Sequence, residues 1–312
     1  MNKSADPRQA FAEALAEVGE KNPHIVALSA DSSSGSGFSI FHKKFPERHL
    51  EFGIMEQGVI GFASGLATMG KIPVVATIAT FVTSRPFEMV RNDIGYMRQN
   101  VKLVGRCGGI TYNDLGPTHH SLEDFALLGT IPGFTLLSPG DPLEIRKATF
   151  AMFDHVGPVY MRIGQQPLPY IYEGDYAFKI GKGFTLREGK DVTLIATGTV
   201  LHRAVAAADI LRKKGISVRV INLPTLKPMD RELIVKAAKE TGKILTVEEG
   251  YLQGGMGSIV CQVLASEYPV PVRMLGIDDR FVSTGPYEAL LSKFNLLADQ
   301  IATVTEEFLK RT

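Results

Sequence analysis

The sequence predicts an α/β protein of two domains, each a mostly parallel sheet flanked by helices. Its 312 residues exceed what one ordinary domain needs. Short apolar runs rich in β-branched residues alternate with segments of helical periodicity, which is the pattern of a parallel sheet covered on both faces. A stretch rich in proline, glycine and charge interrupts this alternation. We therefore expect a first domain over residues 1–175, a linker over 176–190 and a second domain over 191–312.

The first part of the chain begins with a helix. Asp6 suits its N-cap and Pro7 its first turn, and Phe11, Leu15 and Val18 recur at helical spacing. The apolar runs expected as strands are 25–31, 71–81, 101–109, 134–139 and 158–164. The segments expected as helices between them are 59–70 and 143–155.

The second part repeats the alternation on a smaller scale. Its expected strands are 191–199, 217–225, 243–249 and 271–277. Its expected helices are 200–215, 230–242 and 256–268. Strands and helices that alternate in this order form a second sheet with helices on its faces.

The composition excludes several classes of protein. Lys plus Arg number 34 and Asp plus Glu number 33, so the net charge is 34 − 33 = +1. Proteins that bind nucleic acids or membrane surfaces usually carry a basic excess instead. The two cysteines, Cys107 and Cys261, have no metal-ligand spacing. Because the N-terminus lacks a signal-peptide pattern and no apolar run has membrane-spanning length, we expect a cytoplasmic protein with free thiols.

Polar residues gather where an open parallel sheet places its ligand site, at the carboxyl ends of its strands. Four segments have this position: 30–37, 51–58, 80–87 and 110–124. The second of them contains Glu56, which begins an apolar helix. A glutamate in a first helical turn is commonly a solvated charge that the helix dipole favours. The apolar neighbours Ile54 and Met55 indicate a buried carboxyl instead, which could share a proton with a ring nitrogen.

The other three segments are each open to two interpretations. A Gly-Pro turn exposes His119 and His120 in the last segment, either as a plain surface loop or with one histidine facing a ligand. The Ser/Gly loop 30–37 suits a connector or a phosphate-binding loop. Phe81 and Phe87 suit core packing as well as a ligand pocket.

Taken together, these segments resemble the transketolase family. FGIMEQ (52–57) is similar to the family's segment around its glutamate, PVVATIATF (73–81) to its strand into the cofactor pocket, and DLGPTHHSLED (114–124) to its Asp-Gly-Pro-Thr-His loop. The resemblance covers residues 5–312. It implies a pyrimidine-binding domain followed by a transketolase C-terminal domain.

The family's diphosphate-binding motif, Gly-Asp-Gly with a downstream Asn, is missing from the sequence. The resemblance therefore implies the C-terminal subunit of a split transketolase that depends on thiamine diphosphate. An N-terminal partner subunit would supply the diphosphate-binding domain with its Mg²⁺, and no metal is expected on this chain. Self-association through both domains would give a heterotetramer, with the chain inactive alone.

The resemblance also implies residue roles at the cofactor. Glu56 matches the carboxylate that hydrogen-bonds the aminopyrimidine ring and promotes loss of the thiazolium proton. Phe81 and Phe87 match aromatic residues that line the aminopyrimidine pocket, although a third aromatic position is Ser84 here. Asp31 matches an aspartate at the cofactor pocket.

Other matches concern the sugar substrate. His119 matches a histidine that contacts sugar hydroxyls. Arg8 and Arg162 match arginines that bind the sugar phosphate, which suits the forked guanidinium group. Ser34 or Ser36 would be a further phosphate contact. Two departures face the substrate as well: Leu115 replaces the family's aspartate before Gly-Pro, with Asp114 one place earlier, and Cys107 replaces a histidine.

The function implied is transfer of a two-carbon ketol group from a ketose phosphate to an aldose phosphate. The sugars stay open, as does the choice between pentose phosphate metabolism and the breakdown of an unusual sugar. Three alternatives remain. They are another thiamine-diphosphate enzyme (deoxyxylulose-phosphate synthase-like or a 2-oxoacid dehydrogenase E1 beta-like subunit), a non-catalytic paralogue, and a nucleotide-binding α/β protein, whose glycine patterns are absent.

Overall fold

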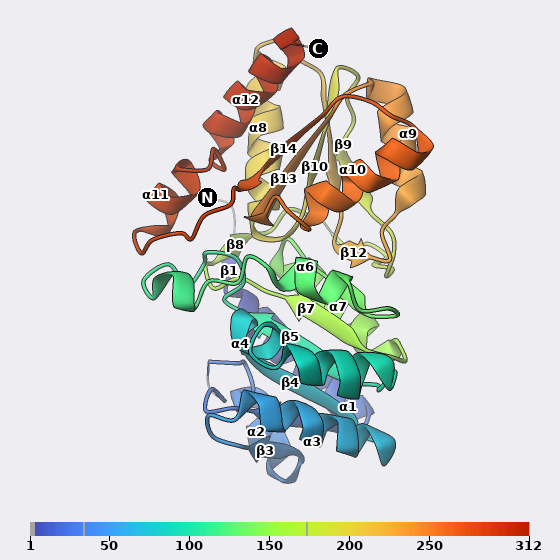
Figure 1. Ribbon diagram of the computed structural model, residues 1–312, viewed down its shortest axis with the longest axis vertical. Helices are drawn as coiled ribbons and strands as arrows, with labels where there is room; N and C mark the ends of the chain where they lie inside the picture. The colour runs from blue at the N-terminus through green and yellow to red at the C-terminus, as the bar shows by residue number, and fades with distance from the viewer. Residues whose placement is uncertain (1–3, 34, 173, 312) are drawn as a thin grey trace.

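The computed structural model describes residues 4–33, 35–172 and 174–311, and it has two α/β bodies stacked along the long axis (Figure 1). Within these residues, seven strands form the first sheet in the order β12-β6-β7-β5-β4-β2-β3. Its strands are β2 (Ile25–Ser29), β3 (His49–Glu51), β4 (Ile72–Ile78), β5 (Lys102–Arg106), β6 (Thr135–Leu137), β7 (Val159–Arg162) and β12 (Thr225–Lys227). All neighbouring strands are parallel except the β12–β6 pair.

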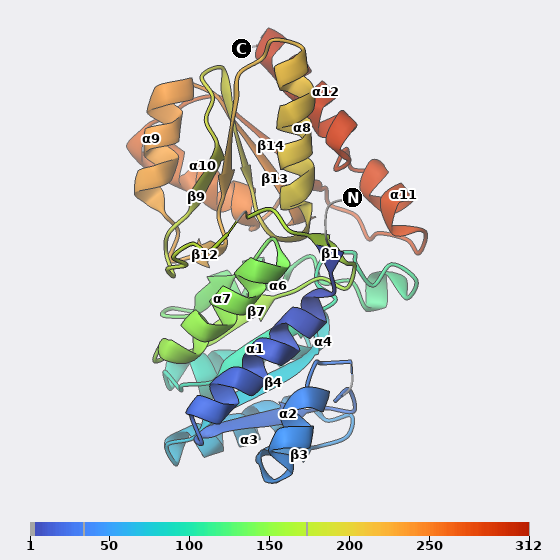
Figure 2. The ribbon, with the colours of Figure 1, turned by 180° about the vertical axis from the view of Figure 1, so that it is seen from behind.

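Helices cover both faces of this sheet. On one face lie α1 (Pro7–Lys21), α2 (Ser39–Lys44) and α7 (Pro142–Asp154), which share one core with β2 and β4 (Figure 2). The other face is covered by α3 (Glu56–Thr68), η2 (Val90–Tyr96) and α6 (Asp124–Gly129). Short helices complete this body, namely η1 (Pro46–Arg48), α4 (Ala79–Thr83), α5 (Phe87–Met89) and η3 (Gly116–Thr118). The short strands β1 (Ser4–Ala5) and β8 (Leu168–Pro169) pair with each other in antiparallel orientation.

In the part from 174 to 311, five strands form the second sheet in the order β14-β13-β10-β11-β9. They are β9 (Phe184–Arg187), β10 (Val192–Ala196), β11 (Val218–Asn222), β13 (Ile244–Tyr251) and β14 (Val272–Ile277). The helices α8 (Leu201–Lys213) and α12 (Ala298–Arg311) pack together on one face, and α9 (Arg231–Thr241) and α10 (Met256–Glu267) pack together near the other. The turn η4 (Gly198–Val200) and α11 (Tyr287–Ser292) complete the body. The α/β architecture is thus confirmed.

The structure differs from the sequence prediction in several places. The expected strand 71–81 ends at Ile78, and α4 follows directly. Part of the expected linker forms β9, which pairs antiparallel with β11. The expected strand 217–225 is divided, because Pro224 lacks the N–H that a continuing ladder needs. Its last residue, Thr225, begins β12, which crosses to the first sheet and pairs with β6.

Glu144 of the first body contacts the second body, and its buried carboxyl should make the free energy of unfolding depend on pH. This fully buried carboxylate of α7 accepts hydrogen bonds from Asn222 of β11 (2.8 Å and 2.9 Å) and from the hydroxyls of Tyr172 and Tyr176 (3.1 Å each). Burial raises its pKa to about 7 from 4.5, against the opposing effect of hydrogen bonds from Gly140 and Asn222. Between these pH values the folded chain holds a proton that the unfolded chain has lost.

The contribution of Glu144 to stability therefore falls as the pH rises through this window. In the Glu144→Gln variant the amide carries no titrating proton and still hydrogen-bonds the two tyrosines. We expect the free energy of unfolding, measured by urea denaturation at pH 5 and pH 7.5, to fall more for the wild type than for the variant. Parallel pH dependences would contradict this assignment.

No helix among the described residues is both long enough and apolar enough to cross a membrane.

Candidate functional site

Glu51 organises the turn from which the candidate site begins. Its carboxylate accepts hydrogen bonds from Ser29 Oγ (2.6 Å) and from the backbone N–H groups of Asp31 (2.7 Å) and Gly53 (3.0 Å). Burial opposes ionisation of Glu51, but these hydrogen bonds outweigh it and hold the pKa of the carboxyl below its usual range. The carboxyl end of β2 is thus tied to the segment that leads into α3. Asp31 has a left-handed backbone conformation (φ 52°) and an exposed side chain.

Glu56 is the first residue of α3, and its side chain is buried. It is only 5% exposed, although its neighbours Ile54 and Met55 are 76% and 48% exposed. Its Oε1 accepts a hydrogen bond from Arg85 Nη1 at 2.9 Å, which makes a partly buried ion pair. The sequence analysis missed Arg85, which follows the short helix α4.

A continuous row of side chains leads from Glu56 to the predicted sugar-contacting histidine. The Arg85 guanidinium lies over the Phe81 ring, 4.0 Å from its centroid. Phe81 meets His119 edge to face, with 5.1 Å between the ring centroids. The Glu56–His119 row (Glu56, Arg85, Phe81 and His119) therefore unites three of the four polar segments that the sequence places at strand ends.

His119 has two further neighbours in its own loop. Its Nδ1 lies 2.9 Å from Thr118 Oγ1, and Tyr112 packs against its ring at a centroid distance of 5.6 Å. Phe87, by contrast, begins α5 and packs, half-buried, against the first hydrophobic core. Ser84, at the position of the missing aromatic residue, donates a hydrogen bond to Glu123 (2.9 Å).

The serine loop after β2 meets two arginines. Ser36 is buried, and its hydroxyl lies 3.0 Å from that of Ser32. A Cβ at Gly35 would stand 3.2 Å from the Arg106 guanidinium carbon, so the loop passes directly over that group. A Cβ at Gly37 would stand 3.1 Å from the Arg8 backbone oxygen. The other candidate serine, Ser34, lies outside the described residues.

Arg106 is a residue that the sequence analysis missed. It ends β5, is 9% exposed, and its Nε has no hydrogen-bond partner among the described residues. Its Nη1 donates to the sulfur of Cys107 (3.4 Å), and the Cys107 thiol donates to Gln165 (2.9 Å). Burial raises the pKa of this thiol, although Arg106 opposes the rise. The sequence predicts a strand over 101–109, which places Arg106 inside it, whereas in the structure the strand ends at Arg106.

Arg8 is about one-third exposed and forms a two-pronged ion pair with Asp6, at 3.1 Å and 2.7 Å. The hydrogen bonds to Asp6 raise the pKa of Arg8, and Cys107 and Tyr112 act in the same direction because they lie close by. The Arg106 guanidinium and the Arg8 backbone thus flank the loop that carries Ser36, and we call Arg8, Arg106 and Ser36 the arginine–serine corner.

Arg162 does not belong to this corner. Its side chain is 6% exposed and pairs with the fully buried Asp124, with 3.0 Å between Nη1 and Oδ1. Its Nη2 donates to the Glu249 carbonyl of the second body (2.8 Å), and the guanidinium lies over the Phe125 ring at 4.2 Å. Asp124 and the second body thus engage this guanidinium, and the phosphate-binding role expected for Arg162 stays a prediction.

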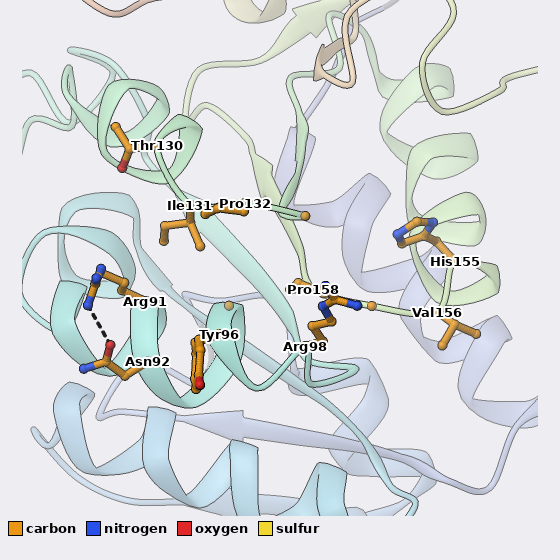
Figure 3. Close-up of a pocket in the computed structure, with 13 residues that line it drawn as sticks. Arg91, Asn92, Tyr96, Arg98, Thr130, Ile131, Pro132, His155, Val156 and Pro158 are labelled. Atoms are coloured by element: carbon orange, nitrogen blue, oxygen red, sulfur yellow. Dashed lines mark hydrogen bonds between the residues drawn. The ribbon is translucent and has the colours of Figure 1, made fainter.

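Hollows in the surface do not by themselves mark the site. One hollow of about 970 Å³ lies beside the segments that lead into β5 and β7 (Figure 3), and no residue of the Glu56–His119 row lines it. Arg91, Tyr96, Arg98 and His155 are among its lining residues, and no predicted site residue is. The candidate site is therefore defined by side-chain geometry.

The two sheets and this site define the chain as a pair of transketolase domains. Family profiles described as "Transketolase, pyrimidine binding domain" and "Transketolase, C-terminal domain" match residues 3–170 and 181–301. The chain belongs to the transketolase family, which confirms the resemblance seen in the sequence. The family implies dependence on thiamine diphosphate.

Relatives of similar length are named as single subunits of transketolases. One subunit of the apulose-4-phosphate transketolase of Phocaeicola vulgatus is 40% identical, with 97% of each chain covered. One subunit of the 6-deoxy-6-sulfo-D-fructose transketolase of Clostridium sp. (strain MSTE9) is 37% identical, with 97% of this chain and 94% of the relative covered.

A longer relative and a solved structure complete the comparison. The "1-deoxy-D-xylulose-5-phosphate synthase 1" of Geobacter sulfurreducens is 40% identical over 96% of this chain but only 47% of its own length. The solved structure "Split gene transketolase, inactive beta4 tetramer" matches with a TM-score of 0.89 and 39% identity, covering 99% of both chains.

The residues present fit the aminopyrimidine half of the cofactor. Glu56 provides a buried carboxylate with one oxygen, Oε1, held by Arg85, and the aromatic ring of Phe81 lies nearby with the Arg85 guanidinium over one of its faces. Among the described residues, no group of three or more His, Cys, Asp or Glu side chains is placed to hold a metal ion.

Proposed function

We propose that this chain is the C-terminal subunit of a split transketolase. The complete enzyme would transfer a two-carbon ketol group from a ketose phosphate to an aldose phosphate. The observation that carries the proposal is the Glu56–His119 row, which leads from a buried carboxylate to a histidine of the loop beside the arginine–serine corner. Cofactor chemistry and sugar recognition would take place at its two ends.

Thiamine diphosphate, when bound, would supply the ring that accepts the electron pair of the broken carbon–carbon bond. Glu56 would hold a proton shared with the aminopyrimidine nitrogen through its second oxygen, Oε2, because Arg85 engages Oε1. Phe81 would pack against the ring and exclude water. Asp31 and Phe87 remain candidates for the pocket wall.

Substrate recognition would involve the other end of the row. His119, supported by Thr118 and Tyr112, would contact sugar hydroxyls. Arg8, Arg106 and Ser36 would bind the sugar phosphate, because guanidinium groups and a hydroxyl suit the phosphate oxygens. Arg8 and Ser36 were expected from the sequence, whereas Arg106 takes the place of Arg162 in this proposal.

A partner subunit would complete the site. Exposed apolar side chains surround Glu56 and continue along α3, namely Ile54, Met55, Phe62 and Met69. We propose that the N-terminal subunit covers this face and brings the diphosphate-binding domain with its Mg²⁺. An assembly of two large and two small subunits in the cytoplasm is part of the proposal. The relative titled an inactive tetramer of beta chains supports the idea that one subunit type alone does not react.

The relatives keep one alternative open, which is a deoxyxylulose-phosphate synthase-like or 2-oxoacid-using enzyme. A transketolase uses a ketose phosphate as its donor, whereas the enzymes of this alternative use a 2-oxoacid. The arginine–serine corner favours a phosphorylated sugar but does not identify the donor. A third interpretation, a non-catalytic paralogue, is disfavoured because a scaffold has no use for a buried Glu56 beside Phe81 and His119.

The test is reconstitution. This chain would be mixed with an N-terminal transketolase subunit from the same organism that carries the Gly-Asp-Gly motif, together with thiamine diphosphate and Mg²⁺. We expect turnover of ketose phosphates by the mixture only, and calorimetry should detect weak or no binding of thiamine diphosphate to this chain alone. Turnover of a 2-oxoacid donor in place of ketose phosphates would select the alternative, and no turnover of either would favour the paralogue.

A further inference from the structure

The loop that carries His119 belongs to the first body but is held by the second. The backbone N–H of Ile110, near the start of the loop, donates to the Glu249 carboxylate of β13 at 2.7 Å. In mid-loop, Asn113 Nδ2 donates to the Gly285 carbonyl (2.8 Å). At the end of the loop, the Leu122 carbonyl accepts a hydrogen bond from the Tyr251 N–H (3.1 Å). The second body therefore contacts this loop at its start, middle and end.

Glu249 is the centre of these contacts. It is 1% exposed, and its second oxygen, Oε2, accepts hydrogen bonds from the hydroxyls of Tyr287 (2.6 Å) and Thr199. Its backbone oxygen accepts from Arg162 of β7. Because three other groups from separate segments fix this residue, its carboxylate is a rigid acceptor for Ile110.

The base of the loop transmits this restraint to the histidine. Gly109 and Ser121 exchange two backbone hydrogen bonds of 3.0 Å, which join the two ends of the loop beside Ile110. A side chain at Gly109 would collide with Glu249, so the loop base lies in direct contact with the carboxylate. Fixing Ile110 therefore fixes both ends of the segment from which His119 projects.

We propose that Glu249 of the second body is a positioning residue for His119, which it holds in place through the amide of Ile110. The proposal gives the C-terminal domain a role in substrate recognition, and it rests on the proposed sugar contact of His119. Glu249 itself touches neither cofactor nor substrate. Its loss should therefore change substrate binding more than the chemical step.

Glu248 provides a matched control. It precedes Glu249 in β13, is equally buried (1% exposed), and also accepts backbone N–H groups, from Met256 (2.7 Å) and Gly257 (2.8 Å). Those partners lie in α10 of its own body. Removing either carboxylate leaves buried donors without an acceptor, but only Glu249 contacts the loop.

The experiment compares Glu249→Ala with Glu248→Ala in the reconstituted complex. Glu249→Ala should raise KM for the ketose donor about tenfold with a smaller change in kcat, because a charge-assisted hydrogen bond is lost. Glu249→Gln should restore KM, since its amide oxygen still accepts from Ile110 while its NH₂ faces the two hydroxyls. Glu248→Ala should leave KM near the wild-type value. An equal KM rise in both alanine variants would overturn the proposal.

A second measurement does not depend on turnover. Backbone hydrogen exchange over residues 108–122 of the full chain should become faster in Glu249→Ala and stay unchanged in Glu248→Ala. If Glu249→Ala does not fold, Tyr287→Phe replaces it, because it removes one donor to the same carboxylate and keeps the ring. Unchanged exchange in the folded variant overturns the proposal. If exchange becomes faster in Glu249→Ala but the wild-type complex turns over no sugar, the proposed function is rejected and the positioning contact of Glu249 still stands.

Discussion

Replacing Glu56 with glutamine or alanine should lower turnover of the reconstituted complex by about 10³-fold, a typical loss for a group that moves a proton in the reaction. Neither replacement can provide a carboxyl proton at the position that Glu56 occupies beside Arg85. The measurement is kcat with saturating thiamine diphosphate, so that weaker cofactor binding is not mistaken for slower chemistry.

The fold should survive this change. Glu56 lies at a helix terminus, and its side chain pairs with Arg85, whose own side chain is 42% exposed. Circular dichroism and thermal unfolding of the Glu56 variants should therefore resemble those of the wild type. Glu232→Gln serves as the control, because Glu232 also lies in the first turn of a helix but is exposed and belongs to α9 of the second body. Wild-type turnover in Glu56→Gln would remove the central residue of the proposed site.

The fold could be predicted for those elements whose burial produces a recognisable order of apolar residues in the sequence. Strands such as β4 and β10 are buried on both faces, so their residues are almost continuously apolar, and the helices between them repeat at helical spacing. No such pattern marks β9 or β12. Each contributes few residues, and each exists because of the strand beside it, β11 for one and β6 for the other.

The site could be predicted in part for a similar reason. Glu56 and His119 stand in segments whose neighbours are informative, namely an apolar helix in one case and a Gly-Pro turn in the other. Arg85 and Arg106 have no such surroundings, and their importance follows from contacts across the fold. Arg85 reaches Glu56 over 29 positions of sequence.

Arg162 shows the limit of reasoning from strand ends. Arg106 and Arg162 both end strands of the first sheet, so the sequence treats their positions alike. In the structure, the serine loop passes over the first, whereas the second body packs on the other and supplies the Glu249 carbonyl as its partner. How two domains pack depends on many weak contacts and leaves no local pattern.

Substitution of these two arginines should therefore affect different properties, namely substrate binding for Arg106 and the stability of the fold for Arg162. Arg106→Ala should raise KM for a phosphorylated ketose about 10-fold to 100-fold, as expected for loss of a charge-assisted contact of roughly 1.5–3 kcal/mol. KM for the same sugar without phosphate should change little. Arg8→Ala should act in the same direction but more weakly, because Asp6 already engages that guanidinium. Steady-state kinetics on the two sugars, with the reconstituted complex, provides the comparison.

Arg162→Met is the contrast, and its effect should be on stability. It leaves Asp124 fully buried without its cationic partner, and breaking a buried ion pair typically costs about 3–5 kcal/mol of the free energy of unfolding. Urea denaturation measures that loss, and any effect on KM should be equal for the phosphorylated and unphosphorylated sugars. A KM rise confined to the phosphorylated sugar in Arg162→Met, with none in Arg106→Ala, would return the phosphate contact to Arg162. If the KM for the phosphorylated sugar rises in Arg106→Ala and not in Arg162→Met, then the second body, by packing on the strand end of Arg162, determines which arginine meets the substrate.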